Sequence, residues 1–338
     1  MTNDELVLQI NQAVADGRKT LDLSGKGLKR LPPDIVNLTL QESLTLGKVE
    51  TWQWVDTHRD PVVIGNELQT LPDELFQLTQ LKTLNLSGNP LGELPAGLSR
   101  MPQLTELIAV DIQLTEIPEF IGQSSYLRRL DLSNNKIRTI PTILGQLGKL
   151  TELALSNNKL KKIPEFIGQL VELIKLELSN NQLRKLPQTI AQLINLKELT
   201  LSNNQFKEIP AVLAQLCNLS NLYLSSNRIA AIPPAIGALL NLTELALSNN
   251  HIECIPQELG RLSKLETLYL YNNKIRAIPA QIGQLTQLTK LTLSNNQIDI
   301  IPEEIQHLRQ LNILALANNR ITKIPEALGK LDNLDVLY

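Results

Sequence analysis

The stretch LRRLDLSNNKIRTIPTILGQLGK, residues 127–149, decides the fold, because its pattern recurs along most of the chain. A proline stands at every 23rd position from Pro72 to Pro325, since 325 − 72 = 253 = 11 × 23. Asparagine keeps the same step from Asn66 to Asn319, and only Ile112 interrupts it. A fixed period of this length indicates a solenoid, in which each unit packs against its neighbours.

Each unit divides into two halves. The LxL segment, Leu130-Asp131-Leu132 in the quoted unit, alternates with period two and predicts a short strand with inward leucines. The half around Pro141 predicts a turn and then a short 3₁₀ or helical turn on the outer face, because proline lacks an N–H. The asparagine amide offers donors and an acceptor, so it is expected to bond backbone groups of its own turn and of the next one. The sequence therefore predicts an α/β solenoid, a horseshoe with a parallel β-sheet on its concave side and an N-terminal capping helix.

The pattern predicts a helical cap over residues 1–19 and repeats over residues 20–338. In the cap, Leu6, Ile10, Ala13 and Val14 share one helical face. The repeats form about 13 units, and a last strand is truncated at Tyr338. Because no polar cap follows that strand, we expect either a longer parent protein or self-association through the open C-terminal edge.

Residues 49–65 are expected to be an insertion that leaves the stack at the end of the second strand. It carries Trp52 and Trp54, the two tryptophans of the chain. Insertions in repeats often lie on the binding rim, and loop tryptophans often anchor a partner. The insertion is therefore a candidate binding element, and a tolerated loop is the alternative.

The segment 107–112 departs from the pattern as well, with apolar Ile108 and Val110 at outward positions. A one-residue slip of the strand would turn both side chains inward. If the register holds, they form an exposed apolar patch about 10 Å from the insertion, two strands away at ~4.8 Å each. We expect Trp52 or Trp54 to fold back over that patch.

Outward strand positions outline a candidate docking surface. Tyr223, Tyr269 and Tyr271 gather around the small Ala246 on a surface of Ser and Thr, which is typical of a contact pocket; tyrosines that merely fill the concavity are the alternative. A second series alternates in charge from strand to strand, so that it can form cross-strand ion pairs or meet a partner. Its glutamates include Glu152, Glu198 and Glu244.

Composition excludes several functions. A net charge of −2 gives no electrostatic case for binding nucleic acid or an anionic membrane. No apolar run approaches the ~18 residues of a membrane span. The two cysteines form no cluster, which suits a reducing cytoplasm. The three histidines stand in distant units, without the spacing of a metal site or a nucleophile–base pair, so no enzyme, metal or cofactor is expected.

The repeat resembles the intracellular Ras-group class of 23-residue leucine-rich repeat proteins, through lines such as LALSNNKLKKIPEFIGQL at 153–170. The N-terminal part resembles the leading segment of bacterial, especially cyanobacterial, Roco proteins. That resemblance rests on LDLSGKGLKRLP at 21–32, LTLGK at 44–48 and the aromatic insertion ending in Gly65-Asn66. In Roco proteins the repeats precede a Ras-like GTPase and a dimerising domain.

The preferred interpretation is a non-catalytic, cytoplasmic scaffold for protein–protein recognition, the regulatory arm of a larger Roco-like signalling protein. One alternative is a fragment of an enzyme, a GTPase or a kinase, whose catalytic domain lies beyond residue 338. Another is a self-associating structural repeat protein.

Overall fold

The computed structural model describes residues 1–55 and 58–338, apart from the side chains of residues 54, 55, 58 and 59. The chain divides into two compact units, Met1–Glu177 and Leu178–Tyr338.

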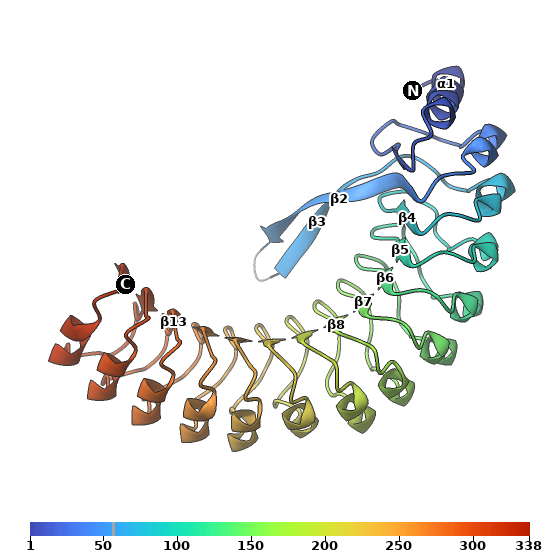
Figure 1. Cartoon of the computed structure of the whole chain (residues 1–338). Helices are drawn as coiled ribbons and strands as arrows, with labels where there is room; N and C mark the ends of the chain where they lie inside the picture. The colour runs from blue at the N-terminus through green and yellow to red at the C-terminus, as the bar shows by residue number, and fades with distance from the viewer. Residues whose placement is uncertain (56–57) are drawn as a thin grey trace. The chain divides into compact units, whose positions relative to one another are not determined.

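The first unit begins with a helix and continues as strands that follow one another in chain order (Figure 1). Its elements are α1 (Asn3–Ala15), β1 (Thr20–Asp22), β2 (Ser43–Val55), β3 (His58–Ile64), β4 (Thr83–Leu86), β5 (Glu106–Ile108), β6 (Arg129–Asp131), β7 (Glu152–Ala154) and β8 (Lys175–Glu177). All but β3 pair in parallel, and residues 23 positions apart, such as Leu130 and Leu153, stand opposite each other. The repeat length thus sets the register of the sheet.

Short 3₁₀ helices return the chain on the side of the sheet away from β3 (Figure 1). They are η1 (Pro33–Asn37), η2 (Asp73–Gln77), η3 (Ala96–Arg100), η4 (Glu119–Gln123), η5 (Thr142–Gln146) and η6 (Glu165–Gln169). The repeated proline precedes each of them with an extended backbone, as at Pro141 with φ −71° and ψ 149°. Proline fixes that φ and lacks the N–H that the first turn would leave unbonded.

The second unit repeats the same arrangement without a hairpin. Its strands are β9 (Glu198–Thr200), β10 (Asn221–Tyr223), β11 (Glu244–Ala246), β12 (Thr267–Tyr269), β13 (Lys290–Thr292), β14 (Ile313–Ala315) and β15 (Val336–Leu337). Its 3₁₀ helices are η7 (Gln188–Gln192), η8 (Ala211–Gln215), η9 (Pro234–Ala238), η10 (Gln257–Arg261), η11 (Ala280–Gln284), η12 (Glu303–His307) and η13 (Glu326–Lys330).

The core of each unit lies between the strands and the 3₁₀ helices. Leu130 and Leu132 of β6 and the following turn are 0% exposed, as is Leu144 of η5. Burying one such side chain contributes roughly 1.5–3 kcal/mol. At the N-terminus, α1 closes this core with Leu6, Ile10 and Ala13, which are 1% exposed or less, whereas Val14, predicted on the same face, is 42% exposed.

The recurring asparagines, here called the ladder asparagines, stitch neighbouring repeats together. The Asn158 side chain donates to the carbonyls of Leu132, at 3.0 Å, and Leu155, at 3.1 Å, and accepts from the Ile137 N–H at 3.0 Å. These bonds join its own turn to the repeat before it. The expected role of the residue is confirmed, although the neighbour it bonds is the preceding turn.

These features confirm the predicted fold class of a parallel-strand solenoid with an N-terminal helix. They also settle the register of β5, where Leu107 stands opposite Leu130 and Ile108 opposite Asp131. The alternative of a strand slipped by one residue is therefore wrong, because Leu107 keeps the inward position with 0% exposure.

The segment predicted as an insertion forms an antiparallel hairpin of β2 and β3, paired from Lys48–Ile64 to Val55–His58. Figure 1 shows it leaving β2 and running over the strands that follow. At its base, two backbones nearly touch, since a Cβ built on Gly65 would lie 1.8 Å from the Gly88 carbonyl oxygen. Gly88 also has a φ of +68°, which favours glycine.

Candidate functional site

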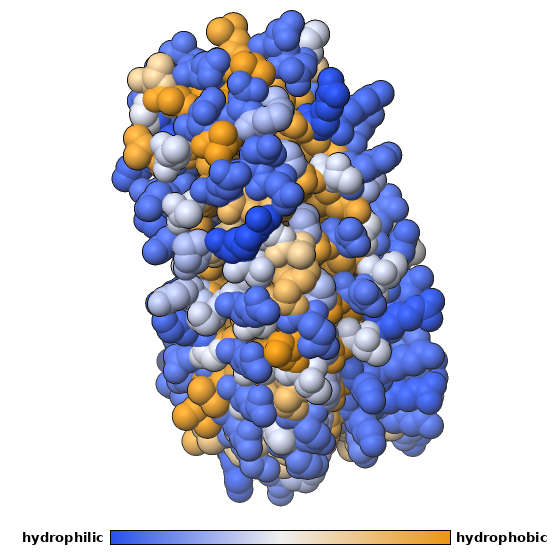
Figure 2. Space-filling view, turned by 90° about the vertical axis from the view of Figure 1, so that its right-hand side faces the viewer, coloured by the Kyte–Doolittle hydropathy of each residue, from blue (hydrophilic) through white to orange (hydrophobic). Residues whose placement is uncertain are grey.

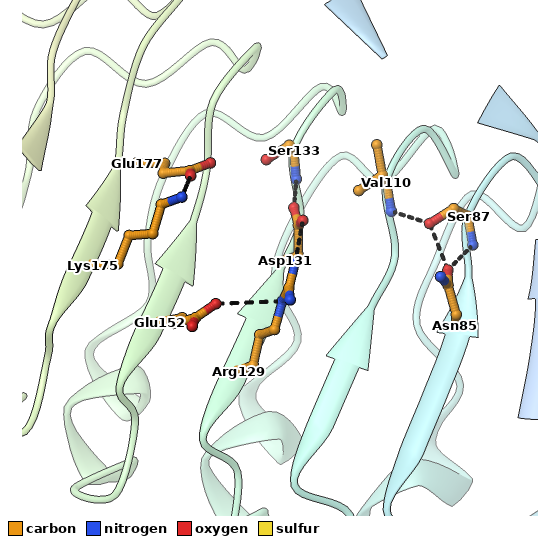
Figure 3. A network of polar contacts seen from close by, with 9 residues as sticks. All are labelled: Asn85, Ser87, Val110, Arg129, Asp131, Ser133, Glu152, Lys175 and Glu177. Atoms are coloured by element: carbon orange, nitrogen blue, oxygen red, sulfur yellow. Dashed lines mark hydrogen bonds and ion pairs between the residues drawn. The ribbon is translucent and has the colours of Figure 1, made fainter. Parts of the chain in front are cut away.

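The outward side chains of the strands form a surface in each unit, here called the strand face. It presents charged and hydrogen-bonding groups above a sheet whose inward side chains are leucines. In the first unit, the strand face carries an ion-pair network on β6, β7 and β8 (Figure 3). Arg129 Nε lies 3.6 Å from Glu152 Oε2 across two strands, and Lys175 pairs with Glu177 along one strand. The cross-strand pairing expected for Glu152 is present.

Asp131 is the buried acid of this network. Its side chain is 10% exposed, and its carboxylate accepts a hydrogen bond from the Ser133 N–H at 3.1 Å. The nearest cation, Arg129, stands 3.9 Å from Oδ2. Burial raises the pKa of Asp131, and the neighbouring Glu177 carboxylate adds to that rise. A buried carboxylate with these neighbours is stabilised by any further positive charge or hydrogen-bond donor beside it.

The position of Val110 differs from the expectation. Ile108 is half-buried on the strand face, but Val110 is 0% exposed and cannot contact a partner directly. The reason is the tight turn after β5, where Asp111 adopts a φ of 56° and the chain passes into the stack. The Val110 N–H donates to Ser87 Oγ at 3.2 Å, as Figure 3 shows. The expected exposed patch of two apolar residues is wrong in this respect.

The aromatic and acidic residues of the hairpin lie in different surroundings. Trp52 stands opposite Pro61 and is 37% exposed. The Trp54 backbone pairs with Arg59, and its side chain lies outside the described residues. Asp60 reaches the turn beside the strand face, because its Oδ1 accepts a hydrogen bond from Asn157 Nδ2 at 3.2 Å. The hairpin therefore extends as far as the turn that follows β7, and the covering of Ile108 by a tryptophan stays a prediction.

In the second unit, the register brings the predicted tyrosines together around a small residue. Tyr223 and Tyr269 each stand opposite Ala246, which lies on the strand between them. The Tyr223 hydroxyl donates to Glu244 Oε2 at 2.9 Å and accepts from Asn221 Nδ2 at 3.3 Å. Burial raises the pKa of Tyr223 far above its usual value, and its bond to Glu244 raises it further. The phenol therefore stays protonated and acts as a donor.

The other residues predicted for this surface lie close by. Lys290 Nζ stands 5.0 Å from the centre of the Tyr269 ring, a cation–π contact. Tyr271 is 37% exposed, the most open of the three tyrosines. Glu198, half-buried on β9, adds negative charge near Tyr223 and contributes to its raised pKa.

The sequence interpretation missed a second row of residues, one position before the ladder asparagines. Asn134, Asn157 and the equivalent asparagines adopt φ values of 54–56°, the left-handed region. Asparagine tolerates this region better than most residues, so the doubled Asn-Asn of most repeats was the signal. Some of these side chains bond along the row, as Asn272 Nδ2 does to Asn249 Oδ1 at 2.7 Å.

Other parts of the surface are weaker candidates for a binding site than the strand faces. An open hollow of about 500 Å³ lies beside η2 and η3, where Arg100 pairs with Asp73 at 2.8 Å and covers the Phe76 ring. On the face shown in Figure 2, hydrophilic residues cover most of the area and hydrophobic ones appear in separate patches. Scattered apolar residues are ordinary on a protein surface. In the described part of the chain, no helix is long and apolar enough to cross a bilayer.

A stack of strand, turn and 3₁₀ units with an asparagine ladder defines a solenoid repeat protein. Family models agree: a leucine-rich repeat region matches residues 234–338, and leucine-rich repeats match residues 125–183, 171–229 and 80–101. A leucine-rich repeat protein of Leptospira interrogans is 32% identical, with 97% of this chain and 93% of that chain covered and a TM-score of 0.75. The chain therefore belongs to the leucine-rich repeat proteins.

Two further solved structures show the same architecture. The ectodomain of the Arabidopsis thaliana receptor kinase GASSHO1/SCHENGEN3, in complex with CASPARIAN STRIP INTEGRITY FACTOR 2, is 28% identical. The match covers 91% of this chain and only 42% of that one, with a TM-score of 0.63. An internalin of Listeria monocytogenes shares the fold at 21% identity and a TM-score of 0.73, over 99% of this chain and 94% of that one. No curated protein sequence gave a significant match.

Leucine-rich repeat domains are generally scaffolds for protein–protein interaction, and their fold is typically non-catalytic.

Proposed function

We propose that this protein recognises protein partners through its strand faces and through the β2–β3 hairpin. The observation that carries the proposal is the tyrosine cluster of the second unit. Tyr223 and Tyr269 flank Ala246, Tyr271 is exposed beside them, and Glu244 holds the Tyr223 hydroxyl. Tyrosines combine a large apolar ring with a polar tip and lose little conformational entropy on binding, which makes them frequent contact residues.

The first unit supports the proposal with a different chemistry. Its strand face carries charged side chains, and Trp52 is an exposed residue of the hairpin, which runs over the same sheet (Figure 1). A partner that meets both a charged face and an aromatic edge gains specificity as well as buried area. An extended partner segment suits such a surface, because equivalent side chains recur every ~4.8 Å along it.

Affinity capture with a triple variant tests the proposal. Tyr223, Tyr269 and Tyr271 are replaced by Ser, and captured proteins are compared quantitatively with those of the wild-type chain. Tyr126→Ser serves as the matched control, because Tyr126 is 54% exposed and lies outside the strands. We expect capture to fall at least tenfold for the triple variant, a loss of about 1.4 kcal/mol, and to persist for the control.

The melting temperature of the triple variant is expected to stay near that of the wild type, because none of the three side chains belongs to the leucine core. Equal capture by the triple variant and the wild type, with folding intact, would reject the tyrosine cluster as a contact surface.

The finer assignment is also a proposal: the chain serves in the cytoplasm as the regulatory arm of a Roco-like protein. The resemblance of residues 21–32 and 44–66 to the leading segment of that family supports it. Reading the gene past the codon for Tyr338 tests it. A phosphate-loop motif followed by a dimerising domain agrees with the proposal, whereas a catalytic domain of another class contradicts it.

A further inference from the structure

Two aspartates occupy the same position in different repeats of the first unit but have opposite surroundings. Asp22 ends β1, and Asp131 ends β6. The Asp22 carboxylate accepts from the Ser24 N–H at 2.9 Å, from Ser24 Oγ at 2.6 Å and from Lys48 Nζ at 2.8 Å. Lys48 lies at the base of the hairpin, where it pairs with Ile64, so its ammonium reaches Asp22 from a segment that is not part of the repeat.

Asp131 lacks two of these three partners. It keeps the bond from the Ser133 N–H at 3.1 Å, but the fully buried Ser133 hydroxyl makes no well-aligned hydrogen bond among the described residues and acts on the Asp131 carboxylate only by lying close enough to oppose the rise of its pKa. No described donor bonds Oδ2, whose closest cation, Arg129, stands at 3.9 Å and is shared with Glu152. In Figure 3 the Ser133 hydroxyl points to the side of β6 on which Glu177 lies. Both groups are thus buried with unused hydrogen-bonding capacity.

A second carboxylate faces this position. The register places Ala154 between Asp131 and Glu177, since Asp131 stands opposite Ala154 and Ala154 opposite Glu177. Two strand steps separate the acids by about 9–10 Å. The side chain between them is only the methyl group of Ala154, so the strand face has a depression there. These three residues form what is here called the acidic notch.

We propose that the acidic notch binds a lysine or arginine side chain of a protein partner, as Asp22 binds Lys48 within the chain. This inference rests on the proposed function and names the chemistry that one of its surfaces recognises. A cationic head between Asp131 and Glu177 would supply the missing donor to Oδ2, and an alkyl stem would pass over Ala154.

The electrostatics of the first unit agree with a cationic guest. Where the lysine is present, partial burial opposes ionisation, but Lys48 and Ser24 still hold the pKa of Asp22 below its usual value. Where it is absent, burial raises the pKa of Asp131. The ion pairs around the notch join Arg129 to Asp131 and Glu152, and Lys175 to Glu177, so each base there faces at least one acid and Arg129 is shared by two. Lys175 pairs with Glu177 on one side of the notch, so a guest cation competes with Lys175 for the Glu177 carboxylate. On the other side of the notch, the guest cation contacts Asp131 Oδ2.

Two small probes test the inference on the intact chain: n-butylammonium for a lysine side chain and n-butylguanidinium for an arginine side chain. Each is titrated at constant ionic strength, and the ¹H–¹⁵N resonance of Ser133 is followed because its N–H bonds Asp131. We expect a saturable shift with at least one probe in the millimolar range. The stronger probe identifies the preferred side chain, and n-butanol, which is uncharged, is expected to give no such shift.

Two variants and one control make the result specific. Asp131→Asn keeps an acceptor for the Ser133 N–H but removes the charge, and Ala154→Leu keeps the charge but fills the notch. Both are expected to weaken probe binding roughly tenfold or more, the loss that accompanies removal of a charge-assisted hydrogen bond. Asp22→Asn, which alters the site already occupied by Lys48, is expected to leave binding unchanged. Melting curves establish that each variant is folded.

A shift that stays linear to the solubility limit, or one that both variants retain, overturns the inference. Partner capture separates this failure from that of the proposed function. If capture depends on the tyrosine cluster while the notch binds neither probe, the proposed function stands and the notch assignment fails.

Discussion

The Asp60 carboxylate accepts a hydrogen bond at 3.2 Å from the side-chain amide of Asn157, a residue 97 positions further along the chain. Asp60 belongs to the hairpin strand β3, and Asn157 to the turn after β7. This bond connects the hairpin, which does not follow the repeat, to the row of left-handed residues beside the strand face.

Replacing Asp60 with Ala is expected to loosen the hairpin without unfolding the repeats. The lost bond lies at a partly exposed site, so the free energy of unfolding should change by less than ~1 kcal/mol. Hydrogen exchange of the hairpin amides, such as those of Thr51 and Val62, should become faster, while the amides of β6 and β7 keep their protection. Unchanged exchange in the hairpin would show that other contacts alone hold it in place.

The contact between Gly88 and the hairpin base yields a prediction with a built-in control. Gly88 and Gly92 both have left-handed φ values, of 68° and 75°. A Cβ at Gly88 would lie 2.6 Å from Val63 Cγ1, whereas one at Gly92 meets nothing within 4 Å. Both alanine variants carry the backbone strain, but only Gly88→Ala also displaces the hairpin, so it should cost roughly 1–3 kcal/mol more. Chemical denaturation measures both, and equal losses would argue against tight packing there.

The ladder asparagines are expected to contribute strongly to stability. Asn158→Ala removes the bonds to Leu132, Leu155 and Ile137 and leaves their backbone groups buried, so we expect a loss of roughly 2–4 kcal/mol in unfolding free energy. Asn333→Ala is the control, because the Asn333 amide bonds the Arg309 carbonyl at an exposed site. Urea denaturation of both variants should separate them by more than ~1 kcal/mol.

The ion pairs of Glu42 predict that part of the stability of the protein is lost in acid. Its carboxylate lies 2.8 Å from both Lys19 Nζ and Lys82 Nζ, and these two ammonium groups lower its pKa from 4.5 to about 2. A lowered pKa in the folded state contributes stability above the unfolded value, and this contribution is lost as the pH falls through the folded value. The melting temperature of wild type minus that of Glu42→Gln should therefore be constant above about pH 5 and shrink towards pH 2. The exposed Glu93→Gln serves as the comparison, and a difference independent of pH would contradict the assignment.

The burial of Asp131 predicts the opposite dependence of stability on pH. Burial raises its pKa in the folded state above 3.8, so folding is weakened as the pH rises and the carboxyl ionises. Asp131→Asn is therefore expected to be more stable than the wild type at neutral pH, and the difference should vanish as the pH falls to 3 and below. Melting curves from pH 3 to pH 7, with the exposed Asp332→Asn as control, measure this. A neutral-pH loss of stability would show that the negative charge has stronger partners than the described side chains provide.

Much of the fold was predictable from the sequence because it follows from the 23-residue period. Equivalent leucines, prolines and asparagines at equal spacing fix the strands, their parallel register and the inward face. The same period aligned Tyr223 and Tyr269 on either side of Ala246. It could not predict which neighbour each asparagine bonds, because both choices satisfy the same donors and acceptor.

The failures have physical reasons as well. Val110 was placed outward by extending strand alternation past Ile108, but the chain leaves the strand there and the left-handed Asp111 turns it inward. The contact of Asp60 with Asn157 depends on how a hairpin leans across several strands, which no repeat pattern encodes. The burial of Asp131 likewise comes from packing around one position and not from its residue type, since the side chain of Asp22 at the equivalent position is 49% exposed.

The asparagine ladder also bears on how such a protein changes over generations. Each amide serves its own turn and the one before, so a whole unit of 23 residues can be duplicated or lost with every backbone group still satisfied. The unit with Ile112 in place of asparagine is the exception, because it has no amide to accept from the unit before it: the Leu91 N–H bonds the Asn89 carbonyl, whereas the equivalent Leu114 N–H bonds Asn135 Oδ1. Duplication of that unit would repeat this gap in the ladder, while the length of the array around it stays free to vary.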